Sequence, residues 1–330
     1  MKEQFVRDLK EGDRVLSFFV VRHKQLEYFR DRTRGQFLTL VLSDRTGQIL
    51  ARVWEKALEL AETFDEGDVI KVLGEVEEYL GRLQVIVRKL RPAKEDEYEL
   101  EDFLPHTERD IEEMLTTVRE TIASVENPYL RALLDKFFTD EEFVAAFSRA
   151  PAARRIHHAY LGGLLEHTVE VIALCQTVIA LYPQIHRDLL LTGALLHDVG
   201  KTREFTYERD IDYSDEGRLL GHVVLSERMI TERVAEIPDF PPELALRLRH
   251  LILSHHGRYE WGSPRRPKTL EACALHYIEN LDAQVNRFAR IIATRRDKTK
   301  PWTEYDTLLR RYLYAGRDEE LAVEEAGPLE

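Results

Sequence analysis

The spacing of hydrophobic and polar residues divides the chain into an N-terminal part with strand-like runs and a longer part with helical periodicity. Runs rich in Val, Phe, Leu and Ile, such as RVLSFFVVRHKQLEYF, GQFLTLVLSD and GQILARVW, are typical of strands between Gly and Asp turns. The stretch DRTGQ at residues 44–48 has the composition of a hairpin turn. A short helical stretch, EKALELAETF, precedes two more strand-like runs that end at Pro92. Three strands, a helix and two strands predict a small all-β barrel over residues 1–92.

From about residue 108 onward, apolar residues recur with helical spacing, for example in IEEMLTTVRETIASV and YLRALLDKFF. The residues between the two parts, 93–113, read AKEDEYELEDFLPHTERDIEE, and we expect this acidic stretch to be a solvated linker. Residues 317–330 are acidic too, and we expect them to fray. The predicted fold is multidomain: a small all-β barrel followed by an all-α domain over residues 114–316.

Composition and charge limit the class of protein. The chain has 330 residues and a net charge of −13, which argues against a generally basic protein that coats nucleic acid. Residues 1–92 have a net charge of +1 and the remainder −14, so a polyanion contact is easier to place in the first part or in a local cleft. No signal peptide or membrane span is evident, and we expect a cytoplasmic protein. Both cysteines, Cys175 and Cys273, lie in apolar helical patterns and are expected to be buried.

The segment FLTLVLSDRTGQILARVW resembles the nucleic-acid-binding OB folds that accompany many RNA enzymes. OB barrels bind single strands with a basic groove and stacking aromatic rings. Five cations and two aromatic residues gather around the first predicted hairpin: Arg22, Lys24, Arg30, Arg32, Arg34, Tyr28 and Phe29. We expect Arg30, Arg32 and Arg34 to contact the nucleic acid. A solvated loop with its aromatic rings packed inward is the alternative, and the sequence leaves both open.

The helical part carries seven residues that are able to bind metal ions, at helix ends or on apolar faces. They are His167, His197, Asp198, His222, His255, His256 and Asp282. Burial of imidazoles and carboxylates beside apolar stripes is costly unless they are paired or coordinated. One such residue would more often be a hydrogen-bonded core histidine, but seven of them indicate a metal site. Gly200 follows the adjacent pair His197–Asp198 and would end the preceding helix.

The ligand types point to phosphate-ester chemistry. Imidazole and carboxylate without thiolate favour Mn, Fe, Co, Ni, Zn or Mg over a structural cysteine-type zinc site. Consecutive helical residues diverge by about 100°, so the pairs His197–Asp198 and His255–His256 would each serve two neighbouring centres. Two ions that share a carboxylate, about 3.5–4 Å apart, activate water near neutral pH and stabilise the oxygens of a phosphodiester.

The ordered set of histidines and aspartates resembles the HD-domain phosphohydrolase superfamily, in the variety whose extra histidines complete a second metal centre. More specifically, HHAYLGGLLEHTVEV, LLLTGALLHDVGKTREF, GHVVLSERM and LILSHHGRYEWGSPRRPKTLEACALHYIENLDA are similar to the YhaM-type 3′–5′ exoribonucleases, which join an OB fold to an HD domain. The resemblance covers nearly the whole chain. It implies one ion held by His167, His197, Asp198 and Asp282, and another held by Asp198, His222, His255 and His256, with Asp198 bridging. Mn²⁺ is the ion that the resemblance suggests.

Further residues are expected to act on the substrate. In the superfamily the lysine that follows the His-Asp pair contacts phosphate, which implies a catalytic role for Lys201 beside Asp198; a helix-dipole contact is the alternative. The loop GRYEWGSPRRPK mixes cations with aromatic rings and suits an entering nucleotide strand. The residues of this loop that we expect to bind substrate are Arg258, Tyr259, Trp261, Arg265, Arg266 and Lys268. A surface loop is the alternative interpretation. His158 precedes the first ligand helix and is expected to support a ligand or position substrate.

The resulting hypothesis is a metal-dependent 3′–5′ exoribonuclease that hydrolyses single-stranded RNA, and single-stranded DNA as a further substrate, to nucleoside 5′-monophosphates. An HD-type phosphohydrolase of small nucleotides, cyclic nucleotides or dNTPs, is the alternative enzyme, because fold does not settle substrate. A nucleic-acid-binding adaptor with a structural HD domain is the alternative outside enzymes, and the complete ligand set argues against it. The sequence does not decide whether the chain forms a homo-oligomer.

Overall fold

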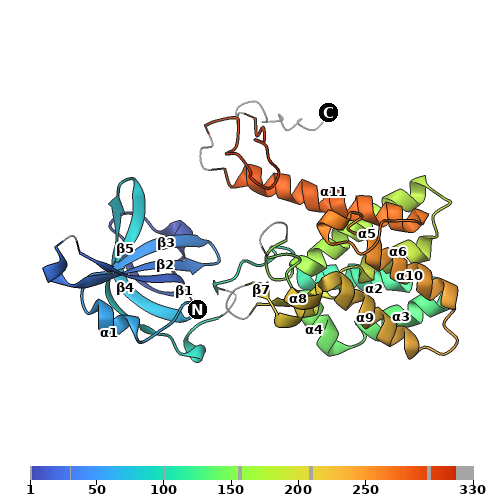
Figure 1. The fold of residues 1–330 in the computed structure, drawn as a ribbon, viewed down its shortest axis with the longest axis horizontal. Coiled ribbons are helices and arrows are strands. Elements are labelled where there is room, and N and C mark those ends of the chain that lie inside the picture. The colour runs from blue at the N-terminus through green and yellow to red at the C-terminus, as the bar shows by residue number, and fades with distance from the viewer. Residues whose placement is uncertain are drawn as a thin grey trace, which may run out of the picture.

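A computed structural model describes residues 2–29, 31–99, 102–154, 158–207, 211–295 and 299–316 of the chain. Figure 1 shows a β-barrel and a helical domain side by side, joined by a short connecting segment. The predicted fold, an all-β OB barrel followed by an all-α domain, is confirmed. Arg30 and the acidic tail 317–330 lie outside the described residues.

The barrel follows the predicted order of three strands, a helix and two strands. Its elements are β1 (Arg14–Tyr28), β2 (Gln36–Asp44), β3 (Gly47–Val53), α1 (Ala57–Ala61), β4 (Val69–Tyr79) and β5 (Arg82–Pro92). The strands close in the order β1-β2-β3-β5-β4, with β3 and β5 parallel and β4 pairing back with β1. Asp44 pairs with Gly47, so the predicted turn at 44–48 is the β2–β3 hairpin. Inward-facing apolar residues such as Val15, Phe19 and Leu40 are fully buried and fill the barrel.

The connecting segment is more than a solvated spacer, because neighbouring residues of it dock on different domains. Phe103 packs against Val20 and Val69 of the barrel. Leu104, the next residue, packs with Leu161 and Phe205 of the helical domain. Burial of these two side chains stabilises the docked arrangement by about 1.5–3 kcal/mol each. The acidic composition of residues 93–113 did not indicate these contacts, because only a few apolar residues of the segment make them.

The helical domain is built around one apolar core. Its helices are α2 (Ile111–Ala123), α3 (Pro128–Phe138), α4 (Glu141–Arg149), α5 (Gly163–Leu181), α6 (Arg187–Leu196), α7 (Lys201–Glu204), α8 (Asp215–Leu220), α9 (His222–Ala235), α10 (Pro242–Ser254) and α11 (Leu270–Ala293). A two-stranded ribbon, β6 (Phe205–Thr206) with β7 (Asp212–Tyr213), lies beside them. Helix α5 packs against α2, α4, α6 and α11. Side chains of Asp110, Asn127 and Thr269 cap the helices that follow them.

Helix α5 is the one helix in the described ranges that is long and apolar enough to cross a membrane by length and composition alone. Leu164, Val171 and Cys175 on this helix are fully buried in the domain core. The high hydropathy of α5 is explained by its central place among the other helices.

The apolar pattern around Cys273 gave a wrong burial prediction. Cys175 is buried, as expected, but Cys273 is exposed. Ala272, Leu275 and His276 form the buried stripe at the start of α11, and Cys273 lies on the outer face of that helix.

Candidate metal centre and nucleic-acid interface

Four helices bring six of the predicted ligands together beside one pocket. His167 comes from α5, the pair His197–Asp198 from the end of α6, and His222 from the first position of α9. His255 and His256 follow the last residue of α10. The pocket has a volume of about 660 Å³ and includes His222, His256, Lys201 and Trp261 in its wall. A cavity of this size is in the range of small-molecule sites.

Asp198 lies at the centre of the cluster and is 2% exposed. Its Oδ2 atom is 3.4 Å from Nε2 of His197 and 3.7 Å from Nε2 of His167. Its Oδ1 atom is 3.4 Å from Nε2 of His222 and 3.6 Å from Nε2 of His255. The two oxygens of one carboxylate are thus divided between two groups of imidazoles.

Every histidine of the cluster has its Nδ1 atom within hydrogen-bond distance of an acceptor. The acceptors are Oδ2 of Asp282 for His167 (2.6 Å), the Ala194 carbonyl for His197 (2.8 Å), Oε1 of Glu204 for His222 (2.9 Å), the Ile252 carbonyl for His255 (2.7 Å) and the Trp261 carbonyl for His256 (2.8 Å). Each bond assigns the proton of a neutral ring to Nδ1 and makes Nε2 the atom with the lone pair, which is the usual arrangement behind metal-binding histidines. All five Nε2 atoms therefore face inward as potential ligands.

The spacing of these nitrogens fits metal ions. Nε2 of His167 is 3.2 Å from Nε2 of His197, and Nε2 of His222 is 3.2 Å from Nε2 of His256. Two nitrogens that each lie about 2.1 Å from one ion are separated by about this distance. Among the described residues, Oδ1 of Asp198 and Nε2 of His255 are buried atoms without a hydrogen-bond partner. Unpaired buried acceptors are costly, and a cation would satisfy them.

Burial keeps four of the five imidazoles neutral. It lowers the pKa of His167 and of His197 to about 3, and it lowers the pKa of His255 and His256 as well. A neutral ring is the form that binds a metal ion. Burial alone would raise the pKa of Asp198, but the charge of Lys201 beside it holds that pKa well below the usual range. The site thus combines an ionised carboxylate with uncharged rings.

Lys201 places an ammonium group beside the cluster. Its Nζ lies 2.6 Å from Oδ2 of Asp198, and the residue is 6% exposed in the pocket wall. Burial opposes the charge, yet the carboxylate of Asp198 raises the pKa of Lys201 above its ordinary value. A fixed ammonium group at this position is able to neutralise a phosphate oxygen.

Asp282 approaches the cluster from behind His167. Its Oδ2 accepts from Nδ1 of His167, on the side of the ring away from His197, and its Oδ1 accepts from the Asn286 amide. His158 stands on the same side, with Nε2 3.3 Å from Oδ2 of Asp282 and 3.3 Å from Glu170. Burial opposes protonation of His158, but these carboxylates raise its pKa to about 9. The side chain of His158 is 1% exposed, and this residue is not among those that line the pocket.

Sequence reasoning missed two carboxylates. Glu204 accepts from both Nδ1 and the backbone N–H of His222 and so fixes that ring. Glu279 lines the pocket together with Lys201. Burial and the nearby charge of Asp198 raise the pKa of Glu279 to about 8. Helical spacing was the available signal, since Glu279 lies one turn before Asp282 on α11.

Glycines allow the close approach of the ligand segments. Gly200 has an ordinary helical φ of −64°, so it does not cap α6 in the left-handed conformation that the sequence suggested. A Cβ at Gly200 would collide with the His222 carbonyl and would lie 2.6 Å from the Ser226 nitrogen. Gly257 has φ +70° and lies against the His276 ring. Both positions need glycine for packing near the site.

The loop after His256 is exposed and places aromatic rings against cations. The Arg258 guanidinium lies 4.7 Å from the Trp261 ring centre, and that of Arg266 lies 5.0 Å from the Tyr259 ring centre. Trp261 shares the pocket wall with His256. Arg265 and Lys268 are tied through their backbones, to the Leu253 carbonyl and the His250 ring respectively, and their side chains are exposed. Of the predicted substrate residues of this loop, Trp261 lines the pocket, whereas Arg258 and Arg266 line a second cavity of about 540 Å³.

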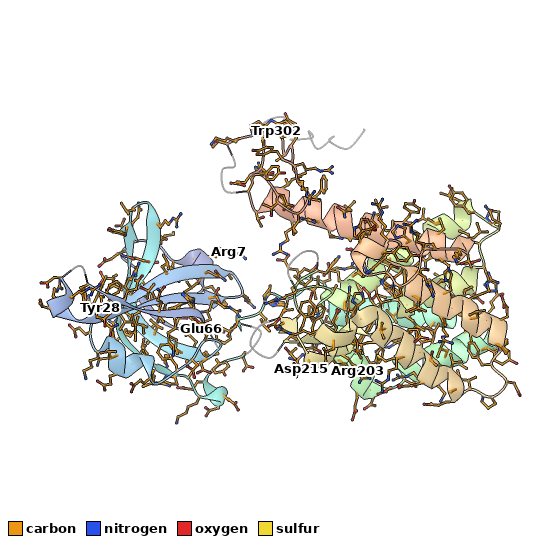
Figure 2. The ribbon with its side chains drawn as sticks, in the orientation of Figure 1. Arg7, Tyr28, Glu66, Arg203, Asp215 and Trp302 are labelled. Atoms are coloured by element: carbon orange, nitrogen blue, oxygen red, sulfur yellow. The ribbon has the colours of Figure 1, made fainter. Side chains whose placement is uncertain are left out.

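The predicted contacts of the barrel lie apart from this pocket. Arg32 lies over the Tyr28 ring at 5.5 Å, and Arg34 lies over the Phe29 ring at 4.6 Å. Figure 2 shows Tyr28 at the end of the barrel away from the helical domain. Phe29 also packs with Phe37 and Trp54, at ring-centre distances of 5.0 and 5.7 Å. Tyr28 is 60% exposed and is the ring of this hairpin most open to solvent.

Comparison with known proteins gives consistent matches for both domains. A model described as an HD domain matches residues 164–284, and one described as an OB-fold nucleic acid binding domain matches residues 20–93. The 3′-5′ exoribonuclease YhaM of Bacillus subtilis (strain 168) is 39% identical over 271 residues, which are 81% of this chain and 84% of the relative. The protein of that name from Bacillus velezensis is 39% identical over 302 residues, 89% of this chain and 91% of the relative. The similarity therefore extends through both domains.

Proposed function

This chain belongs to the family of the YhaM 3′–5′ exoribonucleases, and on that premise we propose that it hydrolyses single-stranded RNA from the 3′ end and releases nucleoside 5′-monophosphates. The observation that carries the proposal is the division of the Asp198 carboxylate between two groups of inward-facing imidazoles. This arrangement suits phosphodiester hydrolysis, and the OB barrel on the same chain suits a polymeric substrate. Single-stranded DNA is a second substrate of the same shape.

The HD domain implies dependence on divalent metal ions. Nε2 of His167 and His197 with Oδ2 of Asp198 would hold one ion. The Nε2 atoms of His222, His255 and His256 with Oδ1 of Asp198 would hold the other. When bound, such ions would polarise the phosphodiester and lower the pKa of water, so that hydroxide is available as the nucleophile near neutral pH. We propose Mn²⁺ as the native ion, with Fe, Co, Ni, Zn and Mg as the alternatives that imidazole and carboxylate ligands accept.

For Asp282 we propose a role other than the metal ligand that the resemblance implied. Because its Oδ2 accepts from Nδ1 of His167, we assign it as a positioning residue that fixes this ring. His158 is assigned to the same supporting group, through its contact with Asp282. Neither residue then faces the substrate.

Other residues of the chain bind and orient the RNA. The Lys201 ammonium, held by Asp198, is placed to neutralise charge that develops on the phosphate. The Trp261 ring in the pocket wall, with the Arg258 guanidinium packed against it, offers a stacking surface for a terminal base. We propose that the enzyme acts in the cytoplasm and away from membranes.

Phosphohydrolysis of a small nucleotide is the second candidate, because a pocket of about 660 Å³ has room for one nucleotide without a polymer. Digestion of 5′-labelled single-stranded RNA with a panel of metal ions, beside cyclic nucleotides and dNTPs, separates the two. We expect a ladder that shortens from the 3′ end, with 5′-monophosphates as products. Turnover of only the small nucleotides would contradict the exonuclease proposal.

A further inference from the structure

The C-terminal hairpin, residues 301–315, follows α11 and is not part of the helical pattern that the sequence suggested. Its two sides are joined by backbone bonds from Thr303 to Leu313 (2.9 Å) and from Asp306 to Arg311 (3.0 Å). Oδ1 of Asp306 accepts from the Arg287 guanidinium at 2.7 Å, which fastens the hairpin to α11. Two residues of the hairpin itself, Thr303 and Leu313, are buried. The hairpin is therefore an ordered unit with a fixed place in the fold.

Four aromatic rings of this hairpin face solvent. Trp302 and Tyr314 form one edge-to-face pair, with ring centres 5.0 Å apart, and Tyr305 and Tyr312 form another, at 5.2 Å. These side chains are each 48–59% exposed. An edge-to-face pair leaves ring faces open, and open ring faces bind unpaired bases without regard to sequence.

The same region carries positive charge in a protein that is otherwise acidic. Residues 287–316 contain eight Lys and Arg and three Asp and Glu, a net charge of +5, whereas the whole chain has a net charge of −13. Arg310 and Arg311 lie on the hairpin between the two tyrosines and are exposed. One of the three acidic residues, Asp306, is already engaged by Arg287 and by two backbone N–H groups. The charge of this region is complementary to a phosphate backbone.

The hairpin also reaches the pocket. Leu308, at its tip, lines the same cavity as Lys201, His222 and His256. Figure 1 shows α11 running out beyond the other helices, with the hairpin at its end on the side toward the barrel. Figure 2 shows Trp302 on this projecting part. A strand that leaves the pocket past Leu308 would meet the rings and the arginines next.

We propose that the C-terminal hairpin is a second binding surface for single-stranded RNA, which stacks the bases just upstream of the 3′-terminal nucleotide. This inference rests on the proposed exonuclease function and adds a binding surface to it. The surface contacts only nucleotides outside the pocket. The apparent affinity for RNA therefore depends on the hairpin when the substrate is long enough to reach it.

The test compares KM for a 16-nucleotide oligoadenylate with KM for a dinucleotide. In Tyr305→Ala/Tyr312→Ala the ratio of the two values is expected to shift by about tenfold against the long substrate, in line with the loss of a stacked base. Arg310→Gly is a second variant that preserves the backbone, because Arg310 has φ +53°, a conformation that glycine adopts freely. It is expected to weaken binding of the 16-mer and to reduce the slope of log K against log salt by about 0.7.

Tyr182→Ala is the matched control, since Tyr182 is 51% exposed at the end of α5, outside the pocket. An unchanged KM ratio in both hairpin variants would overturn the inference. The inference would also be overturned if the hairpin variants kept the wild-type KM ratio but changed their oligomeric state in sedimentation. The rings would then form an interface between copies of the chain. If the wild-type enzyme releases no nucleotide from either oligonucleotide, the proposed function itself is wrong. Anisotropy of labelled 16-mer with chelator present measures the hairpin's contribution to binding separately.

Discussion

Oδ2 of Asp282 lies 2.6 Å from Nδ1 of His167, on the opposite side of the ring from His197. This hydrogen bond makes Asp282 a partner of the imidazole. It also directs Nε2 of His167 toward His197 and the other candidate metal ligands. A carboxylate in this position fixes the orientation of the ring and increases its basicity.

If Asp282 is a positioning residue, two substitutions distinguish the effect of its negative charge from the effect of its hydrogen bond to His167. Asp282→Asn retains an acceptor for Nδ1 of His167 and is expected to keep both ions. Asp282→Ala removes the acceptor and is expected to lower metal affinity by about 10–100-fold. Metal content after dialysis against graded chelator measures both. A complete loss of one ion in Asp282→Asn, as large as in His197→Ala, would show that Asp282 is itself a ligand.

The bridging position of Asp198 predicts unequal losses of metal. Asp198→Ala is expected to lose both ions, whereas His197→Ala and His256→Ala each weaken one centre. Exonuclease activity of Asp198→Ala should fall by at least about 10²–10³-fold, as for the removal of a major electrostatic interaction. Elemental analysis gives the metal content. His106→Ala is the control, because His106 is exposed in the connecting segment and does not line the pocket. Retention of both ions in Asp198→Ala would refute the bridge.

Lys201 is expected to act on the phosphate more than on the metal centre. Lys201→Met keeps the bulk of the buried chain and removes the ammonium, so kcat should fall by about 10²–10³-fold. KM and metal content should change much less. Single-turnover digestion of labelled RNA, with elemental analysis of the same sample, separates these effects. If Lys201→Met kept the wild-type kcat, the role of Lys201 would be limited to balancing the charge of Asp198.

Packing at Gly200 predicts a stability defect. Gly200→Ala places a Cβ against the His222 carbonyl and 2.6 Å from the Ser226 nitrogen, and the free energy of unfolding should decrease by about 1–3 kcal/mol, as for other overpacked sites. Urea unfolding followed by circular dichroism measures the change in the helical domain. Gly47→Ala is the control, since its Cβ would lie 3.4 Å from its nearest neighbour and should change stability by about 0.5 kcal/mol or less. Equal stability of the two variants would contradict the proposed close approach.

The arginines of the first hairpin provide a test of the barrel. Reversal of charge at Arg30, Arg32 and Arg34 is expected to weaken RNA binding and to reduce its salt dependence, by about 0.7 in slope for each phosphate that the protein no longer neutralises. Filter binding over a range of salt concentrations gives the slope. Arg119→Glu is the control, because Arg119 is an exposed arginine of α2 in the helical domain. Unaltered slopes would favour the solvated-loop interpretation of this hairpin.

Much of the site was predictable because metal ligands are rare on apolar helices. His167 and His197 stood out as polar residues within core-facing patterns, and both are fully buried. The same patterns gave no warning of Glu204, which lies in an ordinary charged stretch at the end of α7 and contacts His222 only because the chain folds back after β6, β7 and α8. The basic and aromatic composition of residues 287–316 was present in the sequence too, but the average charge of the long helical part concealed it.

The sequence by itself determined the two domains, their order and the identity of the inward-facing histidines, because strand and helix periodicities and buried ligand types are local properties. Only the tertiary structure decided which nitrogen of each ring faces the centre and how the oxygens of Asp198 are divided. It also placed Asp282 behind His167 and Leu308 at the mouth of the pocket. These relationships depend on hydrogen-bond partners and helix crossings between residues far apart in the chain, and no local pattern encodes them.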